Sequence, residues 1–533
     1  MTNLFDKLKC SLDLILWYFK TSKIRNTKSI YKNKTLIISE VTTSLATVKV
    51  NCILAKCLES VGYKIIIIFR HKQIFYELYY KLLNINKFYY LDRYPSSHQS
   101  KMVKKILETA NHADNFINCE IDGINVGKWI ASRIVREEKV GEFDIDKYIG
   151  KKLNDYANDS VNAILKIKEI LKNNKNCSII FNERGYSPSG EIFDYCIKKK
   201  INTIQWFGSP LDDHHSFKRY NQHNKQCHPL TLSDQSFNDL LSHKSVNLFN
   251  RDVLKYLNEQ YSKNKWFNRQ NLQENKRIYN KDELIEKLNL DPQKKIAVIF
   301  SHIMYDATFF YGTSLYGNYK IWLQETLKEA AKNENVNWIL RIHPVNKFKN
   351  DIDGIDDISL EEKLLKETFE NLPENIFLIR PDTDISTFSF FNTIDYGLTV
   401  RGTVGCELSC FGIPVFTAGT GRYSNNGFTI DSKTKKSYKT KLNKIQNYPK
   451  LTKKQVKLAR IYTYGSLIAR SIPMDGINVK YNSKNLLHAY HTNVFFENVK
   501  VKELIKKKDI KLLLNWFDDE YLKQSNRDLL YIN

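Results

Sequence analysis

The chain has 533 residues, of which 42% are hydrophobic and 13% aromatic, so it can fill more than one core and two domains are expected. It contains only 20 glycines and 11 prolines, which excludes a fibrous or disordered protein. The formal net charge of +24 favours anionic partners, but no zinc-finger, RNA-recognition or basic-zipper pattern occurs, so nucleic acid is not an expected partner.

Residues 1–34 predict an amphipathic helix followed by a basic segment. Apolar side chains recur at helical spacing at Phe5, Leu8, Leu12, Ile15, Leu16 and Phe19, and Lys20, Lys23, Arg25 and Lys28 follow. Asp6 and Asp13 interrupt the apolar run, which is not typical of a signal peptide. Two interpretations stay open: a helix that lies on an anionic membrane surface, or one that packs on the protein's own core.

Residues 35–245 predict a first α/β domain. Strands are expected over 35–38 and 64–69, with a helix over 46–61 that ends at Gly62. Such a strand–helix–strand unit is typical of a parallel sheet. Further strands are expected over 177–182 and 202–206, with a helix over 190–200 between them.

A polar, helical linker over 246–293 precedes a second α/β domain over 294–480. Strands are expected there over 296–300, 338–342, 376–379, 396–400 and 414–418, with a helix over 321–332. Residues 481–533 predict a helical C-terminal tail.

The segment from Thr399 to Tyr423 is rich in glycine and leads into a short helix. Its five glycines are Gly402, Gly405, Gly412, Gly419 and Gly421. Glycine lets a backbone approach a ligand closely, and the free N–H groups that open a helix suit a phosphate. Arg401 and Arg422 flank this loop and supply positive charge, so the segment predicts a phosphate-sugar or diphosphate site.

Other polar side chains follow predicted strands of the second domain. Arg341, His343 and Pro344 come directly after one strand, and Ser301 and His302 after another. Because ligands bind at the carboxyl ends of open α/β sheets, these residues are candidates for contact with a phosphate or a sugar hydroxyl.

Three acidic or hydroxyl residues have a structural interpretation as well as a functional one. Glu407, one turn into the short helix, either accepts hydrogen bonds from ribose hydroxyls or only stabilises the helix dipole. Asp384 or Ser386 is expected to cap the helix that follows residue 386.

In the first domain, Glu183 follows one strand, and Asp212, Asp213 and His214 follow another. A phosphate-sugar site suggests an enzyme that uses a nucleotide-sugar. If such an enzyme transfers the sugar with inversion, it needs a general base to deprotonate the acceptor hydroxyl, and these four residues are the available candidates. Zinc-ligand spacing is absent from them.

Four stretches taken together carry a family resemblance. They are LRIHP, RPDTDIST, TVRGTVGCELSCFGIPVFTAGTGRYSNNGFTID and IQWFGSPLDDHHSFKRYN. They resemble the bacterial capsular and surface polysaccharide biosynthesis proteins, which are similar to GT-B glycosyltransferases including the capsule Kdo transferases. The resemblance covers roughly residues 35–480 and is strongest over 297–431. It implies an α/β, GT-B-like fold with two Rossmann-like domains and an interdomain cleft.

The resemblance also implies site residues. His343 and Pro344 correspond to the donor-phosphate turn, and Thr403, Gly405 and Glu407 to the donor loop and helix start. Where the Kdo transferases have an acid–glycine base motif, this chain has residues 205–208 (QWFG) with no carboxylate. The catalytic groups are therefore expected among Asp212, Asp213, Glu183 and His343. The donor-binding set is Arg341, His343, Pro344, Arg401, Gly402, Thr403, Gly405, Glu407, Thr420, Arg422, Ser301 and His302.

These features predict a glycosyltransferase of capsule or surface polysaccharide biosynthesis. It would transfer a sugar from a CMP- or UDP-linked donor to a saccharide or lipid-linked acceptor, with no other cofactor and no metal. We expect a cytoplasmic protein, peripheral on the inner face of the plasma membrane, with residues 35–245 as the acceptor domain. The alternatives are a UDP-sugar 2-epimerase-like enzyme and a non-catalytic component that binds polysaccharide or nucleic acid.

Overall fold

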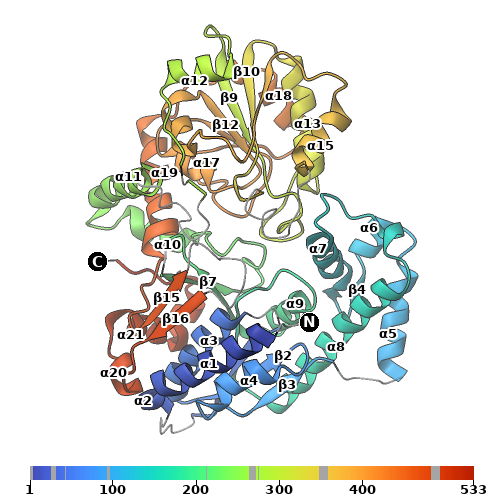
Figure 1. Ribbon diagram of the computed structural model, residues 1–533, viewed down its shortest axis with the longest axis vertical. Coiled ribbons are helices and arrows are strands. Elements are labelled where there is room, and N and C mark those ends of the chain that lie inside the picture. The colour runs from blue at the N-terminus through green and yellow to red at the C-terminus, as the bar shows by residue number, and fades with distance from the viewer. Residues whose placement is uncertain are drawn as a thin grey trace. The chain divides into compact units, whose positions relative to one another are not determined.

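The computed structural model describes residues 4–25, 32–41, 44–92, 97–211, 213–262, 272–273, 275–346, 358–481 and 492–532 (Figure 1). The chain divides into two compact units. The first unit consists of Met1–Ile134, Phe143–Lys225 and Arg470–Asn533, and the second of Val135–Glu142 and Gln226–Ala469. The domain boundaries expected from the sequence stay predictions.

The first unit is built on a six-stranded sheet with the order β3-β2-β1-β6-β7-β8. Its strands are β1 (Lys34–Glu40), β2 (Tyr63–Phe69), β3 (Phe88–Tyr90), β6 (Cys177–Phe181), β7 (Asn202–Gly208) and β8 (His215–Tyr220). All neighbours are parallel except β8, which runs antiparallel to β7. When these six strands are numbered by their order in the chain, the sheet order is 3-2-1-4-5-6, which is the strand order of a doubly wound dinucleotide-binding fold.

Helices cover this sheet, and two of them form where the sequence predicts helices, over 46–61 and 190–200. α3 (Leu45–Ser60) starts at Ser44, whose side chain accepts a hydrogen bond from the backbone N–H of Thr47. α8 (Lys151–Asn173) and α9 (Ser189–Lys198) belong to the same unit. A hairpin of β4 (Glu120–Ile121) and β5 (Ile124–Asn125) turns at Asp122 and Gly123.

The C-terminal tail belongs to the first unit and is only partly helical. Residues Thr492–Phe496 form the strand β16, which pairs antiparallel with β15 (Ile477–Tyr481), so the helix expected from residue 481 onward is wrong there. The strand forms because Val494 and Phe496 join the buried core beside α3. The tail continues as α20 (Val501–Leu504), α21 (Lys508–Asp518) and α22 (Glu520–Gln524).

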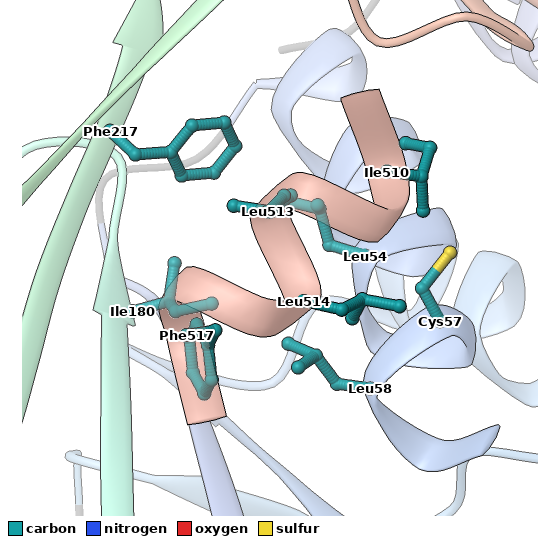
Figure 2. Close-up of a pocket in the computed structure, with 9 residues that line it drawn as sticks. All are labelled: Leu54, Cys57, Leu58, Ile180, Phe217, Ile510, Leu513, Leu514 and Phe517. Carbon is teal, nitrogen blue, oxygen red and sulfur yellow. The ribbon is translucent and has the colours of Figure 1, made fainter. Parts of the chain in front are cut away.

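α21 packs its apolar side on α3 and on strands β6 and β8 (Figure 2). A small cavity remains there, and its lining is wholly apolar: Leu54, Cys57, Leu58, Ile180, Phe217, Ile510, Leu513, Leu514 and Phe517. The tail is therefore part of the core of the first unit.

The second unit repeats the same strand order in a sheet that is parallel throughout, β11-β10-β9-β12-β13-β14. The strands are β9 (Lys295–Phe300), β10 (Val336–Arg341), β11 (Ile376–Ile379), β12 (Tyr396–Thr399), β13 (Val415–Thr417) and β14 (Ile430–Asp431). The prediction of two Rossmann-like sheets in an α/β protein is confirmed.

One face of this second sheet packs against α13 (Tyr319–Lys332), α15 (Leu360–Thr368) and α18 (Lys435–Leu442). Trp338 and Leu340 of β10 point into that core. The unit also contains α11 (Val246–Ser262), α12 (Lys281–Leu288), the short α17 (Val404–Ser409) and α19 (Lys453–Thr463). Ser386 caps the turn that follows it, as expected, by accepting from the backbone N–H of Phe388.

No helix in the described part of the chain is both long and apolar enough to cross a bilayer.

Candidate functional site

The candidate site lies where the strand order of the second sheet reverses, between β9 and β12. His302 follows β9, and its Nε2 lies 3.0 Å from Oγ1 of Thr399 at the end of β12. The same Nε2 accepts hydrogen bonds from the backbone N–H of Val400 (3.2 Å) and Arg401 (3.4 Å). His302 thus ties together the two loops that flank the switch point, which is the usual ligand position in such sheets.

The imidazole of His302 is neutral at physiological pH. Burial lowers its pKa well below the usual value, and the nearby charges of Arg401 and Arg422 lower it further. Its ring stacks on Tyr319 at the start of α13, with centroids 4.3 Å apart. Because Nε2 accepts backbone hydrogens, the ring proton belongs on Nδ1.

Arg401 carries a buried charge with no counterion. Its side chain is 5% exposed, and Nη1 donates to the backbone oxygen of Phe310 at 3.1 Å. Its Nε and Nη2 are buried and have no hydrogen-bond partner in the described residues. Its guanidinium carbon lies 5.3 Å from the centroid of the Tyr319 ring.

A second guanidinium lies within electrostatic range of the first. Burial lowers the pKa of Arg422, and the charge of Arg401 adds to that effect. Nη2 of Arg422 bonds to Nε2 of His228, while its Nε has no partner among the described residues. Across the described ranges, no carboxylate lies within ion-pair distance of either Arg401 or Arg422. Arg401 is buried, whereas Arg422 is half-buried and bonded to His228. An unpaired buried cation is costly, so the surroundings of Arg401 favour an anion.

The loop after β10 joins the site through Ser301. Its Oγ accepts the backbone N–H of His343 at 3.0 Å and donates to Oε1 of Glu361 at 2.9 Å. Nδ1 of His343 accepts the backbone N–H of Val345 at 3.2 Å, which leaves the proton of the neutral ring on Nε2. Burial raises the pKa of Glu361 to about 7. Pro344, half-buried, follows in the same turn.

Arg341 lies apart from this cluster. It alternates with Trp338 and Leu340 along β10 and therefore points to the opposite face of the sheet from α13. Its Nη1 donates to the backbone oxygen of Arg380 at 2.6 Å, and burial lowers its pKa to about 10. The structure thus brings together His302, His343, Arg401 and Arg422 but places Arg341 elsewhere. A donor-binding role for Arg341 stays a prediction.

Glu407 is buried in the first turn of α17. It is 1% exposed, and its Oε2 accepts a hydrogen bond from the hydroxyl of Tyr261 at 2.7 Å. Burial raises its pKa to about 7, against the opposing effects of Tyr261 and Arg422. This contact accounts for Oε2, whereas Oε1 is buried and has no hydrogen-bond partner in the described residues. The ribose contact stays a prediction.

The glycines of residues 399–423 mostly allow protein segments to approach each other. A Cβ on Gly405 would lie 1.9 Å from the hydroxyl of Tyr423, which itself donates to the backbone oxygen of Gly402 at 2.6 Å. A Cβ on Gly421 (φ +107°) would lie 2.2 Å from the backbone oxygen of Tyr311. The loop over 311–314 is therefore locked against the 418–421 segment, and this contact was not foreseen from the sequence.

The remaining predicted donor residues line the same loops. Gly402 lies beside His302, and Thr403 precedes α17 without a side-chain capping bond. Oγ1 of Thr420 bonds to Oγ1 of Thr313 at 2.7 Å, which further ties the two loops together.

The base candidates follow β6 and β7, at the carboxyl edge of the first sheet. Oε1 of Glu183 accepts the backbone N–H groups of Arg184 (2.6 Å) and Gly185 (2.8 Å). Asp213 has φ +63° in the turn between β7 and β8, and Asp212 lies outside the described residues. The side chain of Gln205, in the segment that corresponds to the acid–glycine motif, donates to the backbone oxygen of Asn182 at 3.0 Å.

Sequence reasoning missed four residues that build this site: Tyr319, His228, Glu361 and Tyr261. His228, Glu361 and Tyr261 each lie 60 or more residues from the residue they contact, whereas Tyr319 lies 17 residues from His302. Asn318, a good helix cap before Tyr319, was the one local signal that could have placed Tyr319 at a helix start.

No protein-family model and no curated protein matches the chain. Among solved structures it is similar to the KpsC beta Kdo 2,4 transferase of Thermosulfurimonas dismutans, with 12% identity, a TM-score of 0.33, and coverage of 62% of this chain and 88% of that one. It is also similar to UDP-GlcNAc 2-epimerase from Neisseria meningitidis bound to UDP-GlcNAc, with 12% identity, a TM-score of 0.25, and coverage of 81% and 96%. The wall teichoic acid polymerase TagF matches with 12% identity, a TM-score of 0.23, and coverage of 86% and 93%. Such distant likenesses carry no argument about function.

Replacing Gly421 with alanine should disrupt the second unit. The methyl group would meet the backbone of the 311–312 loop, and a positive φ would strain the residue, so we expect a loss of about 3 kcal/mol in the free energy of unfolding. Gly317→Ala is the matched control, since Gly317 also has positive φ (+83°) but nothing lies within 4 Å of its Cβ position. The free energy of unfolding of this control, measured with urea, should fall by about 1 kcal/mol. Equal losses in the two variants would contradict the close packing around Gly421.

Glu407→Gln should change how stability depends on pH. The pKa of Glu407 is about 7 in the folded protein, against an ordinary glutamate value of 4.5. Between these two pH values, Glu407 therefore keeps its proton in the folded state and loses it in the unfolded state. Stability should therefore fall as pH rises through this window, by an amount on the order of 3 kcal/mol that the glutamine variant does not show. Urea unfolding at pH 5 and pH 8 measures the difference.

The control for that experiment is Glu325→Gln. The hydrogen bond from Lys439 lowers the pKa of Glu325, so its contribution disappears only below the pH 5–8 range. The difference between this variant and the native protein should stay constant from pH 5 to pH 8. A constant difference for Glu407→Gln as well would contradict the raised pKa.

Proposed function

We propose that the protein is a glycosyltransferase whose second unit binds the phosphate groups of a nucleotide-sugar donor beside Arg401. The observation that carries this proposal is the buried guanidinium of Arg401, which has two nitrogens without partners and no neighbouring carboxylate in the described residues. Arg422 adds a second cation in electrostatic range. A phosphate accepts charge-assisted hydrogen bonds from guanidinium groups, and two such cations match the charge of a diphosphate.

The position of the cluster favours a nucleotide over a simple anion. Open α/β sheets with this strand order bind nucleotides at the switch point, which here lies between His302 and Thr399. A neutral His302 suits such a site because it holds the loop through accepted hydrogen bonds and adds no third fixed charge.

Arg401, Arg422 and His343 would also assist the cleavage of the bond between the sugar and the nucleotide. As the bond between the sugar and the nucleotide phosphate breaks, negative charge grows on the leaving phosphate. Oriented donors on Arg401 and Arg422, and the Nε2 proton of His343, would stabilise that charge without reorganisation. We assign His343 to this donor role, in the turn that the family resemblance links to the donor phosphate.

Activation of the acceptor hydroxyl falls to a carboxylate of the first unit in this proposal. Glu183 and Asp213 are the described candidates. The two backbone N–H bonds that Glu183 accepts favour its ionised form, which is the form a general base requires. The donor is a CMP- or UDP-linked sugar, and the acceptor a saccharide or a lipid-linked saccharide of surface polysaccharide synthesis.

Arg401→Met should abolish donor binding without unfolding the protein. In the native protein, UDP or CMP at about 100 times its dissociation constant should add about 2.7 kcal/mol of stability, and the variant should lose that gain. Removing an unpaired buried charge should leave the ligand-free protein about as stable as before, since relief of burial offsets the lost bond to Phe310. Thermal unfolding with and without each nucleotide measures both.

The matched control is Arg460→Met, because Nε of Arg460 also donates to a backbone oxygen, that of Cys410, at 2.9 Å. It should keep the nucleotide response. A nucleotide response that survives in Arg401→Met would reject the site.

Glu183→Gln and Asp213→Asn should separate catalysis from donor binding. The variant that removes the base should lower kcat by about 100-fold or more while the nucleotide still stabilises the protein. The assay supplies UDP- or CMP-sugar with an oligosaccharide acceptor and follows product by mass spectrometry. Epimerised sugar formed without any acceptor would instead identify an epimerase, and full activity in both variants would exclude these two residues as the base.

A further inference from the structure

In the N-terminal helix α1 (Leu4–Lys20; Figure 1), residues 11–20 carry apolar side chains on two sides, and only one of these sides is buried. Leu14 and Trp17 are 9% and 2% exposed and belong to the core of the first unit. Leu12, Ile15, Leu16 and Phe19 are between 54% and 65% exposed. Their spacing of three and four residues places them on one side of the helix.

The buried face is held by polar contacts as well as by packing. Asp13 accepts hydrogen bonds from Nζ of Lys49 (2.6 Å) on α3 and from the hydroxyl of Tyr79 on α4 (Ile74–Lys81). The rings of Trp17 and Tyr79 lie 5.8 Å apart. Asp13, which interrupts the apolar run in the sequence, thus attaches the helix to α3 and α4 of the first unit through hydrogen bonds.

Hydrogen bonds to Asn498 also hold the C-terminal end of α1. Nδ2 of Asn498 donates to the backbone oxygen of Phe19 at 3.2 Å, and its Oδ1 accepts the backbone N–H of Lys23 at 3.0 Å. The outward apolar face is therefore presented by a helix anchored at Asp13, at Trp17 and at its C-terminal end. Its exposure is a property of the folded unit.

Exposed apolar side chains are concentrated on this helix. Of the thirteen large hydrophobic side chains that are exposed in the described residues, five lie on α1, including Tyr18 at 44%. Contiguous exposed apolar groups of this kind mark an interaction surface.

We propose that this face is a docking surface for an anionic lipid membrane, on which α1 lies parallel to the surface. Charge complementarity identifies the occupant. Lys20, Lys23 and Arg25 directly follow the apolar face, and the whole chain carries a formal net charge of +24. An apolar helix face flanked by basic residues is the combination that partitions into the headgroup region of anionic bilayers.

The aromatic side chains at the end of α1 fit the same environment. The guanidinium carbon of Arg25 lies 3.9 Å from the centroid of the Tyr18 ring, and its Nη2 donates to the backbone oxygen of Tyr18 at 2.7 Å. This arrangement places a cation and an amphipathic ring beside Phe19, as at a membrane–water boundary. A specific protein interface uses about 20 residues a side, whereas insertion into a headgroup layer needs only one apolar helix face.

The experiment is co-sedimentation of the full chain with vesicles of phosphatidylglycerol and phosphatidylcholine mixed, compared with phosphatidylcholine alone. We expect the protein to pellet with the anionic vesicles and to be released, at least tenfold, as salt rises from 0.05 to about 0.5 M, because screening weakens attraction of the basic residues. The absence of pelleting with anionic vesicles would overturn the proposal, and so would equal binding to both vesicle types.

The variant Ile15→Ser/Phe19→Ser removes apolar groups that are exposed, so it should unfold at the temperature of the native protein while its vesicle affinity falls at least tenfold. The matched control is Tyr521→Ser, because Tyr521 is exposed to 67% on α22 of the same unit and should not affect vesicle binding. Unchanged vesicle binding in the double variant would overturn the proposal. A dimer in sedimentation velocity that the double variant dissociates would assign the face to a second copy of the chain and overturn it likewise.

Discussion

The charge of Arg401 is the constraint on which the candidate site depends. Its guanidinium is enclosed by Phe310, Tyr319 and the loop that follows β12, and among the described residues only one of its nitrogens finds a partner. A protein interior cannot hold an ionised group at low cost without a counter-charge. The guanidinium of Arg401 thus keeps unsatisfied hydrogen-bond donors, and we propose that an anionic ligand accepts from them.

The neighbouring groups are arranged so that this charge is not cancelled by the protein. His302 stays neutral and acts as an acceptor for the β12 loop. Glu407, the carboxylate nearest in sequence to this loop, is directed to Tyr261. Glu361 is bonded to Ser301 and is held partly protonated by burial. The carboxylates are therefore engaged elsewhere, and the local field stays positive, which suits phosphate.

Rigidity of the site comes from backbone contacts that only glycine allows. Gly421 and Gly312 bring two loops into direct contact, and Gly405 lets the Tyr423 hydroxyl reach the backbone of Gly402. These contacts fix the positions of Arg401 and Arg422 before any ligand arrives. Preorganised donors of this kind are what a developing negative charge requires.

Nine of the twelve strands of the two main sheets, the helices α1, α3, α9 and α13, and the sheet edge that carries the motifs could be predicted from the sequence alone. Buried parallel strands are continuous apolar runs, so segments such as 64–69 and 376–379 are visible in the chain, and polar motifs that follow them must lie at the carboxyl edge. Tertiary structure alone decided which polar groups meet. The turn of Arg341 to the opposite face, the bond between Tyr261 and Glu407, the strand at 492–496 and the two faces of α1 all depend on partners distant in the chain. Local sequence cannot specify such pairs, because packing and hydrogen bonding across the fold select among conformations that are similar in energy locally.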